Sequence, residues 1–267
     1  MCISNIKRTL VFLFISVLFL NSCEQGEQRK VIMVIFAHPD DETTIGPVLA
    51  KYAENNDLYL VLATDGRWGV TEHAGIPAGD TLVAIRNEEA ACSCKALGIN
   101  PPIHLGAADG LGLANEQGDY YGMVNILKEK IDSLIREYQP DLIITFGPGG
   151  DTGHSDHRLI GAITTEVVLK ERLGKEMRLF YFEWTKEQND KYHWWGLNYA
   201  DQEMLPTVIS YDSIDRLKAI ESIKCYTSQY TKAEMDVWIS AELEDETKQL
   251  NFRQVIINDK TRSDFFE

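Results

Sequence analysis

The apolar segment from Val31 to Phe36 runs directly into Ala37-His38-Pro39-Asp40-Asp41-Glu42. An unbroken apolar run that is rich in β-branched residues predicts a strand buried on both faces. Similar strands alternate with helical segments from residue 31 onward, which indicates an α/β protein built around a mostly parallel sheet. Ligands bind at the carboxyl edge of such sheets, so we expect this acidic turn to belong to a functional site.

The expected elements follow one another with short connections. The helix at 80–97 is expected to begin with Asp80 as its N-cap and to end at Gly98. Asp212 and Asp215 predict a capping box at the start of a later helix. We predict strands at residues 31–36, 58–64, 103–105, 141–146, 178–182 and 252–257, and helices at about 45–54, 80–97, 127–138, 154–173, 212–226 and 232–249.

A second strand also opens into histidines and a carboxylate. Residues 141–146 lead through a glycine-rich stretch into His154-Ser155-Asp156-His157. His38 and Asp41 are three residues apart, as are the two histidines of the second motif, so each pair can face one way within a turn. Catalytic zinc takes three ligands of the His, Asp or Glu type and lowers the pKa of a bound water to about 7. The two motifs together therefore predict a metal site.

Each motif alone has a simpler interpretation. Asp40-Asp41-Glu42 could cap the N-terminus of a helix, where carboxylates interact well with the dipole. The sequence from His154 to His157 could be a solvated turn. The occurrence of both motifs after buried strands favours the metal site.

These motifs resemble those of the PIG-L/LmbE-type zinc-dependent N-acetylglucosaminyl deacetylases, and the first of them is highly specific. The resemblance covers about residues 31–182. It rests on Ala37-His38-Pro39-Asp40-Asp41-Glu42, Thr64-Asp65-Gly66, the Arg86 and Glu89 helix ending in Leu97-Gly98, Asp109, Gln139-Pro140-Asp141 and Gly153-His154-Ser155-Asp156-His157. Ser155 departs from the family, which commonly has proline there; this change is expected to loosen the turn without affecting metal chemistry.

The resemblance implies a Rossmann-like (LmbE-like) fold, with a mostly parallel sheet and helices on both faces. We expect a single deacetylase domain of this type over residues 31–267. The part from about residue 184 carries little signal of chemistry, and we interpret it as a lid, a support or an interface. It also implies that Zn²⁺ is bound by His38, Asp41 and His157.

The catalytic roles follow from the same resemblance. Asp40 would be the general base and His154 would stabilise the tetrahedral oxyanion. Asp156 would orient or charge-tune a neighbouring histidine.

The resemblance also implies residues that contact the substrate, but each of these residues has an alternative structural role. Arg86 and Asp109 match positions that bind sugar hydroxyls, but each could instead be a structural ion pair or a loop cap. The aromatic residues could stack on a sugar ring, or they could belong to the core or to a subunit contact. They are Trp184, Tyr192, Trp194, Trp195 and Tyr199.

The amino-acid composition limits which classes of molecule the protein is expected to bind. With 26 basic and 41 acidic residues, the formal net charge is −15. The sequence contains no cluster of Lys and Arg that could bind a polyanion, so the composition disfavours a nucleic acid or another phosphate-rich partner, and we expect no nucleic-acid binding. A content of 44% hydrophobic residues is enough to fill a sizeable core.

The N-terminus predicts a targeting segment. Lys7-Arg8 precede an apolar stretch from Leu10 to Leu20, which is too short for a bilayer span of about 20 residues. Leu20-Asn21-Ser22-Cys23 resembles a bacterial lipobox. We predict a signal peptide at 1–23, a lipid on Cys23, a tether at 24–30, and a lipid-anchored protein of the bacterial cell envelope, periplasmic or surface-exposed. The alternative is an ordinary secretory signal in which Cys23 is incidental.

Three cysteines remain after this processing: Cys92, Cys94 and Cys225. Three thiols do not make a disulfide framework. Cys92 and Cys94 are two apart on a helix and point to different faces, so they are interpreted as small semi-buried residues without a bridge or a metal.

We therefore expect a lipid-anchored zinc hydrolase that removes an acetyl group from an N-acetylated sugar, glycan or related amide. A homo-oligomer is compatible with the sequence. One alternative is a two-metal phosphoesterase that uses Mn²⁺ or Mg²⁺, although no Lys or Arg cluster is available to offset a phosphate. The other is a non-catalytic sugar-binding envelope lipoprotein, although every expected catalytic position holds a competent residue.

Overall fold

The computed structural model describes residues 29–111, 120–171, 177–192, 196–255 and 264. The expected signal segment with Cys23, most of the expected tether, and Trp194 and Trp195 lie outside the described residues. Within the described ranges, every helix is too short or too polar to span a bilayer.

The strands of the main sheet are β1 (Val31–Phe36), β2 (Asp57–Thr64), β3 (Ile103–Ala107), β4 (Leu142–Phe146), β5 (Arg178–Phe182), β8 (Thr207–Ser210) and β9 (Gln249–Gln254). Their order in the described residues is β3-β2-β1-β4-β5-β9-β8. The first five are parallel, and β9 pairs antiparallel with β5 and β8. In the central strand, Val34 lies opposite Leu60 of β2 and Ile144 of β4. The predicted α/β fold with a mostly parallel sheet is confirmed.

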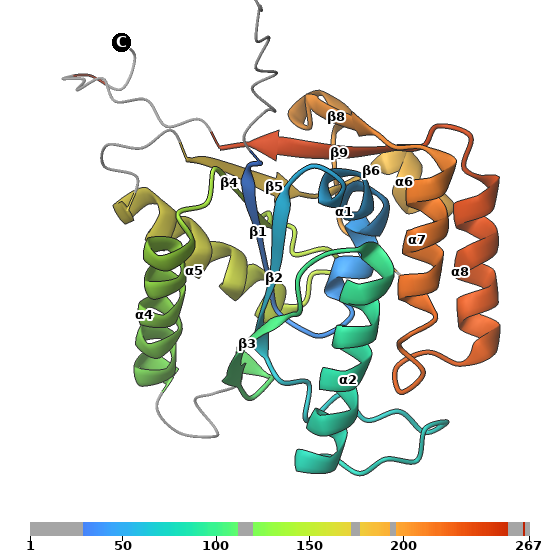
Figure 1. The fold of residues 1–267 in the computed structure, drawn as a ribbon, viewed down its shortest axis with the longest axis horizontal. Helices are drawn as coiled ribbons and strands as arrows, with labels where there is room; N and C mark the ends of the chain where they lie inside the picture. Colours follow the sequence, from blue (N-terminus) through green and yellow to red (C-terminus); the bar gives the residue numbers. More distant parts are fainter. Residues whose placement is uncertain (1–28, 112–119, 172–176, 193–195, 256–263, 265–267) are drawn as a thin grey trace, which may run out of the picture.

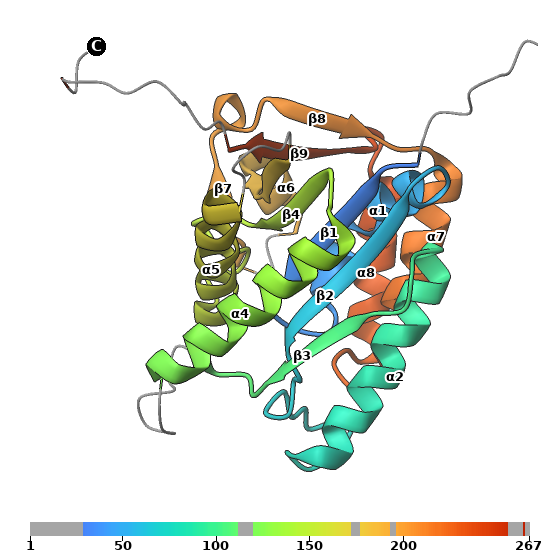
Figure 2. The ribbon, with the colours of Figure 1, turned by 60° about the vertical axis from the view of Figure 1, so that its left-hand side comes forward.

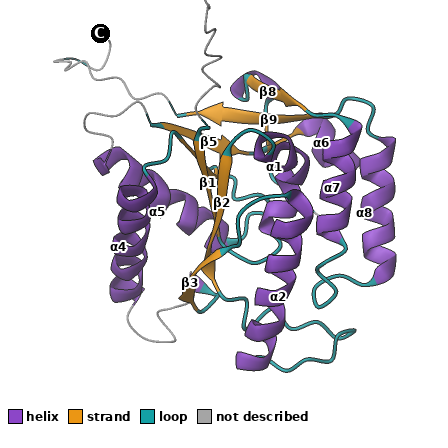
Figure 3. Ribbon diagram, viewed as in Figure 1, coloured by secondary structure: helices purple, strands orange, loops and turns teal. Residues whose placement is uncertain are grey.

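Helices cover both faces of this sheet (Figures 1 and 2). One layer contains α1 (Gly46–Ala53), α2 (Asp80–Leu97), α7 (Ser213–Ile223) and α8 (Lys232–Glu244), and α7 contacts both α1 and α2. The opposite layer contains α4 (Tyr120–Tyr138) and α5 (Ser155–Glu171). Figure 3 shows the strands between these two helical layers. The shorter elements are η1 (Asp41–Ile45), β6 (Trp184–Thr185), α6 (Lys186–Lys191), β7 (Tyr199–Ala200) and η4 (Gln202–Met204).

The helix ends agree only in part with the predictions. The predicted capping box at Asp212 and Asp215 is present at the start of α7, and Gly98 ends α2 in a left-handed conformation. The prediction that Asp80 is the N-cap of α2 is wrong, because Gly79 holds that position with φ of 113°. Asp80 is instead the first helical residue, where a carboxylate still interacts well with the helix dipole.

The C-terminal elements depart most from the predictions. The helix expected at 232–249 ends at Glu244, and a left-handed Lys248 with φ of 48° turns the chain into β9. β8 was not predicted, because it has only four residues and lies at the edge of the sheet with alternating exposure. Such a short edge strand carries too weak a pattern for recognition from sequence.

Cys92 and Cys225 form a disulfide, with Cα atoms 5.8 Å apart. The interpretation of Cys92 as a semi-buried residue without a bridge is therefore wrong. That interpretation compared Cys92 with Cys94, which is a free and buried thiol. The true partner lies 133 residues away and becomes a neighbour only because α7 packs against α2.

Helix α5 approaches strand β4 closely at Gly161. A Cβ atom at Gly161 would lie 2.3 Å from the carbonyl oxygen of Phe146. The ring of Phe146 also stacks on the ring of His157, with centroids 4.2 Å apart, and His157 lies one helical turn before Gly161. Gly161 therefore sets the distance between the end of β4 and the helix that carries His157.

Gly161→Ala is expected to lower the free energy of unfolding by about 1–3 kcal/mol, which is the usual cost of overpacking. Helix propensity alone would act in the opposite direction by about 1 kcal/mol. Urea unfolding of the two proteins measures the difference.

The matched control is Ala162→Gly at the exposed neighbouring position of α5. This change is expected to cost only the propensity difference of about 1 kcal/mol. A Gly161→Ala protein as stable as the parent would contradict the close contact.

Candidate metal centre

The two histidine-containing turns lie side by side because β1 and β4 are neighbours in the sheet. The rings of Phe36 and Phe146, at the ends of these strands, stack with centroids 4.2 Å apart. The chain leaves β1 through His38 into η1, and it leaves β4 through residues 147–154 into α5. His38 and His157 come within 3.1 Å of each other although they are 119 residues apart in sequence.

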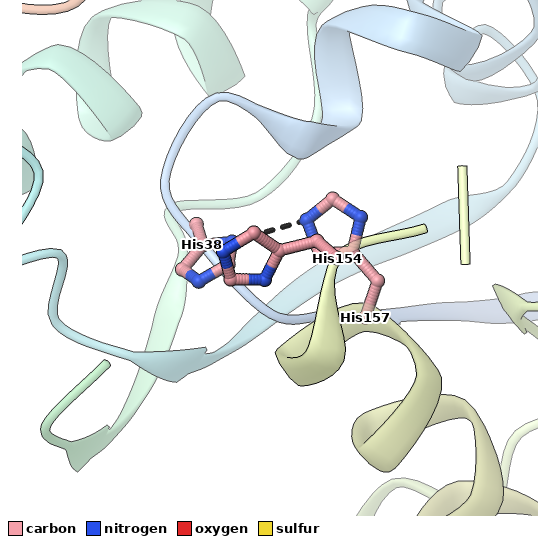
Figure 4. A group of neighbouring side chains, drawn as sticks. All are labelled: His38, His154 and His157. Atoms are coloured by element: carbon pink, nitrogen blue, oxygen red, sulfur yellow. Dashed lines mark hydrogen bonds between the residues drawn. The ribbon is translucent and has the colours of Figure 1, made fainter. Parts of the chain in front are cut away.

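Three potential ligand groups, His38, Asp41 and His157, converge at this point. His38 Nδ1 lies 3.1 Å from His157 Nε2 (Figure 4). Asp41 Oδ1 lies 3.1 Å from His157 Nε2, and Asp41 Oδ2 lies 3.7 Å from His38 Nδ1. Tetrahedral ligands at the zinc–nitrogen and zinc–oxygen distances are about 3.3 Å apart. The three groups are therefore spaced like the ligands of one ion.

The hydrogen bonds on the far side of each ring determine where the protons lie. His38 Nε2 is 3.1 Å from Asp156 Oδ2, so we assign its proton to Nε2 and a lone pair to Nδ1. His157 Nδ1 is 3.2 Å from the carbonyl oxygen of Gly150, so its proton lies on Nδ1 and its lone pair on Nε2. In these neutral tautomers, two lone pairs and the Asp41 carboxylate face one another. A cation between them, either a metal ion or a proton on one of the rings, removes their repulsion.

His154 offers a second candidate ligand, since one nitrogen from each of His38, His154 and His157 lies within 4.8 Å of the others. However, the backbone N–H of Asp156 donates to His154 Nδ1 over 3.2 Å, which places the proton of the neutral ring on Nε2. Burial and the nearby His38 and His157 lower the pKa of His154, which favours this neutral form. His154 is then a hydrogen-bond donor, and the ligand set that fits is His38, Asp41 and His157.

Asp41 is fixed by its own turn. Its Oδ2 accepts the backbone N–H groups of Ala37 and His38 at 3.0 and 2.7 Å. Burial opposes its charge, but His157 and His38 lower the pKa of Asp41 below the ordinary value. Burial also opposes a charge on His38, whereas Asp156 and Asp41 raise its pKa to about 10. The carboxylates therefore make this point strongly favourable for positive charge.

Asp40 lies beside the ligand set with a strained backbone. Its φ of 111° is in the left-handed region, which is costly for a residue with a side chain and occurs at functional sites. Arg86 Nη2 and the Tyr230 hydroxyl both lie 3.2 Å from Asp40 Oδ2. Burial raises the pKa of Asp40 to about 6, and Arg86 opposes this rise. Such a carboxylate is suited to proton transfer near neutral pH.

All of these side chains line one cavity of about 280 Å³ at the carboxyl edge of the sheet. The sequence-predicted residues in its wall are His38, Asp40, Asp41, Arg86, Asp109, His154 and His157. Asp156 stands behind His38, where its Oδ2 accepts the backbone N–H of Gly110 at 2.7 Å. The structure thus brings together every predicted site residue within the described ranges.

Arg86 and Asp109 also have structural contacts. Arg86 is 3% exposed and donates to the carbonyl oxygen of Pro39 in addition to its pairing with Asp40. Both carboxylate oxygens of Asp109 accept the backbone N–H of Trp68 at 3.1 Å, as a loop cap does. Both residues therefore shape the cavity wall, and their contacts with a sugar stay a prediction.

Two of the aromatic residues singled out from the sequence reach the cavity. Trp184 and Tyr192 line its wall, and Trp184 Nε1 donates to the buried carboxylate of Asp151. Tyr199 on β7 is 49% exposed. Stacking of a sugar on Trp184 or Tyr192 remains a prediction.

Several residues of the cavity wall were not predicted from the sequence, among them Asp151, Gln229, Tyr230 and Trp238. Asp151 stands three residues before His154, so its position beside the motif was an available signal. The other three lie in a C-terminal region with no recognisable motif. They reach the cavity only because the chain after α7 returns to the end of β1, which no local pattern reveals.

Residues 33–168 match the family described as PIG-L, GlcNAc-PI de-N-acetylase. The chain is 33% identical over 155 residues to the 1D-myo-inositol 2-acetamido-2-deoxy-alpha-D-glucopyranoside deacetylase of Rhodococcus erythropolis, covering 52% of this chain and 53% of that protein. The corresponding protein of Mycobacteroides abscessus is 31% identical over 154 residues, covering 52% and 55%. The chain thus spans about half the length of these relatives.

Solved structures establish the fold alone, because their sequences are distant. The N,N'-diacetylchitobiose deacetylase of Pyrococcus horikoshii has a TM-score of 0.60 at 20% identity, over 85% of this chain and 84% of that one. GalB, the 4-carboxy-2-hydroxymuconate hydratase of Pseudomonas putida, also has a TM-score of 0.60, at 15% identity over 87% and 99%. Since these two proteins are named for different reactions, the fold alone does not determine the reaction, and the residues of the site must determine it.

Substitution distinguishes the two candidate ligand sets, which differ in Asp41 and His154. Asp41→Asn and His157→Ala are expected to reduce bound divalent metal from about one ion per chain to near zero. His154→Gln is expected to retain the ion. Elemental analysis of the purified proteins measures the content.

Asp236→Asn is the matched control, because Asp236 is exposed on α8, away from the cavity, and its carboxylate pairs with Lys232. Its metal content is expected to equal that of the parent. Loss of metal from His154→Gln combined with retention in Asp41→Asn would reverse our assignment.

Proposed function

The chain belongs to the PIG-L family, and from this premise we propose that it is a zinc-dependent hydrolase that removes an acetyl group from an N-acetylated sugar of the GlcNAc type or a related amide. The relatives compared above are named deacetylases of an acetamido sugar. The observation that carries the proposal is the convergence of His38, His157 and Asp41 beside Asp40 in one cavity.

The donor set supports zinc as the ion. Two imidazoles and one carboxylate are the ligands of catalytic zinc sites, which keep a fourth position open. When bound, the ion would act as a Lewis acid and provide a nucleophile at neutral pH. Asp156 and the carbonyl of Gly150 would keep the His38 and His157 rings in the orientation and tautomer that coordination requires.

Asp40 is proposed as the general base. Arg86 and Tyr230 hold its Oδ2, so Oδ1 is the oxygen available for proton transfer. It would take a proton from the attacking water as the water oxygen bonds to the amide carbon. When the carbon–nitrogen bond breaks, the same proton would pass from Asp40 to the leaving nitrogen. The products are a free amine and acetic acid, which ionises to acetate by releasing its proton to the solvent or to the amine.

His154 is proposed to stabilise the oxyanion. Its ring lies beside the ligand set, with centroids 4.8 Å from His38 and 5.1 Å from His157. The tautomer assigned above makes Nε2–H the donor. A preorganised neutral donor near a developing negative charge stabilises the transition state.

The substrate would enter with its acetamido group first. The cavity of about 280 Å³ is at the small end of ligand sites, so it suits one sugar ring and its acetyl group. Arg86 and Asp109 are proposed to contact sugar hydroxyls, and Trp184 and Tyr192 to offer apolar surface to the ring.

Two other functions have less support. A phosphoesterase with two Mn²⁺ or Mg²⁺ ions would need Asp156 as a ligand, but this carboxylate is engaged by His38 and the Gly110 N–H. Arg86, the buried cation in the cavity, is already paired with Asp40. A non-catalytic sugar-binding protein would have no need for a strained carboxylate beside the ligand set.

We also propose that the protein acts in the cell envelope, anchored by a lipid on Cys23. The disulfide between Cys92 and Cys225 supports this location, because such bridges persist in oxidising compartments and are rare in the cytoplasm. The lipobox-like Leu20-Asn21-Ser22-Cys23 supports the anchor.

Asp40→Asn is expected to keep its metal and to lower the rate of acetate release by about 10²–10⁴-fold, the usual contribution of a general base. Asparagine has the same size and tolerates the left-handed backbone, but its amide cannot carry the proton. The measurement is acetate release from a panel of N-acetylated sugars, with and without a chelator.

Asp236→Asn again serves as the control and should match the parent. An Asp40→Asn protein as active as the parent would refute the assignment of the base. Two manganese ions per active chain, with phosphate ester cleavage and no acetate release, would support the phosphoesterase instead.

Cys23→Ser is expected to abolish lipid attachment and to release the protein from membranes into the soluble fraction. Metabolic labelling with a fatty acid and membrane fractionation measure the two effects. Cys94→Ser, which changes a buried thiol of α2, should remain labelled. Unchanged labelling of Cys23→Ser would show that Cys23 is incidental.

A further inference from the structure

The chain segment 225–230, immediately after α7, lies outside the family match at residues 33–168 and yet forms part of the cavity. We propose that this segment, tied to α2 by the Cys92–Cys225 disulfide, is a clamp that positions the Asp40 carboxylate through the hydroxyl of Tyr230. The clamp deepens the proposed function, since it acts on the general base assigned there.

Tyr230 gives the clamp its contact with the reaction centre. Its hydroxyl donates to Asp40 Oδ2 over 3.2 Å, across 190 residues of sequence. Arg86 reaches the same oxygen from α2, also at 3.2 Å. Two donors from separate elements thus fix one oxygen of the base and leave the other available to the cavity.

A polar face of α2 holds the segment in place. Arg86, Glu89 and Ser93 follow the i, i+3, i+7 spacing of one helical face, and all three are buried. Glu89 accepts the backbone N–H of Ser228 at 2.7 Å and its hydroxyl at 2.6 Å. The segment is therefore bonded to α2 two residues before Tyr230.

The same face also holds the turn that carries Asp40. Ser93 donates to the fully buried carboxylate of Glu42, and Tyr226 donates to the same oxygen at 2.6 Å. The other oxygen of Glu42 accepts the backbone N–H of Asp40 at 3.3 Å. The segment 225–230 and the turn that contains Asp40 and Glu42 are thus both hydrogen-bonded to α2. Asp40 lies where this turn meets the segment.

The disulfide closes this arrangement covalently. Cys92 lies on α2 beside Ser93, and Cys225 is the first residue of the segment. The bridge joins positions 133 residues apart in sequence. It limits how far the segment can move away from α2, and so how far the Tyr230 hydroxyl can move from Asp40. Small displacements of a catalytic group are costly to the rate.

The first test removes the hydroxyl alone. Tyr230→Phe is expected to lower kcat by about tenfold or more, as for the loss of a hydrogen bond to a charged group, with KM and bound metal unchanged. Tyr181→Phe is the matched control, because it removes a tyrosine hydroxyl that bonds Thr165 at 2.8 Å on β5, away from the cavity. An unchanged kcat in Tyr230→Phe would overturn the proposal.

The second test asks whether the disulfide acts through Tyr230. Reduction with a phosphine, which unlike a dithiol reductant is a poor metal chelator, is expected to lower kcat of the parent by about threefold. The Tyr230→Phe protein should show no further loss on reduction. The Cys92→Ser protein should match the reduced parent. A loss of equal size in parent and Tyr230→Phe would show that the bridge merely stabilises the fold.

The third test needs no activity. The unfolding free energies of Asp40→Asn, Tyr230→Phe and the double variant in urea are expected to be non-additive when the disulfide is intact, and clearly closer to additive in the Cys92→Ser background. Coupling without acetate release would uphold the clamp and reject the deacetylase. Acetate release with additive unfolding energies would uphold the deacetylase and reject the clamp.

Discussion

The site depends on the parallel pairing of β1 with β4. This pairing joins two segments that are more than 100 residues apart and makes them end at the same edge of the sheet. An antiparallel β4 would place the following turn about 17 Å away, at the other end of a five-residue strand. The ring of Phe36 stacks on that of Phe146, which in turn stacks on the ring of His157. The position of the strands relative to each other therefore also fixes the position of His157. The metal centre is therefore a consequence of sheet topology.

Electron-donating groups of His38, Asp41 and His157 converge at the carboxyl edge of the sheet, and this convergence gives the site its affinity for a cation. His38 and His157 each direct a lone pair inward because an acceptor behind the ring holds the proton outward. A cation between these groups removes the repulsion among them, and without a metal ion a proton can take that place, because Asp156 and Asp41 raise the pKa of His38 to about 10. Metal binding and stability are consequently linked, because an ion that binds only the folded state stabilises it.

The sequence was sufficient for the parts of the structure that rest on local patterns. The buried run at 31–36, the capping box at Asp212 and the spacing within each histidine motif have local physical causes, and the fold class followed from them. The Cys92–Cys225 bridge and the contact of Tyr230 with Asp40 had no local signal, because both depend on how α7 packs against α2. The short edge strand β8 was not predicted for another reason, since four half-exposed residues show too little hydrophobic periodicity.

Glu42 shows why a motif cannot be interpreted one residue at a time. In sequence it is a third acid beside Asp40 and Asp41, and chemistry would be its obvious role. In the structure it is fully buried, burial raises its pKa to about 7, and its oxygens accept from Ser93, Tyr226 and the Asp40 backbone. An isolated carboxyl group would be costly at this position. The donors offset that cost, so Glu42 can join the strained turn to α2 and to the segment 225–230 that follows α7. The acid that is farthest from the reaction thus holds the backbone of the acid that is proposed to carry it out.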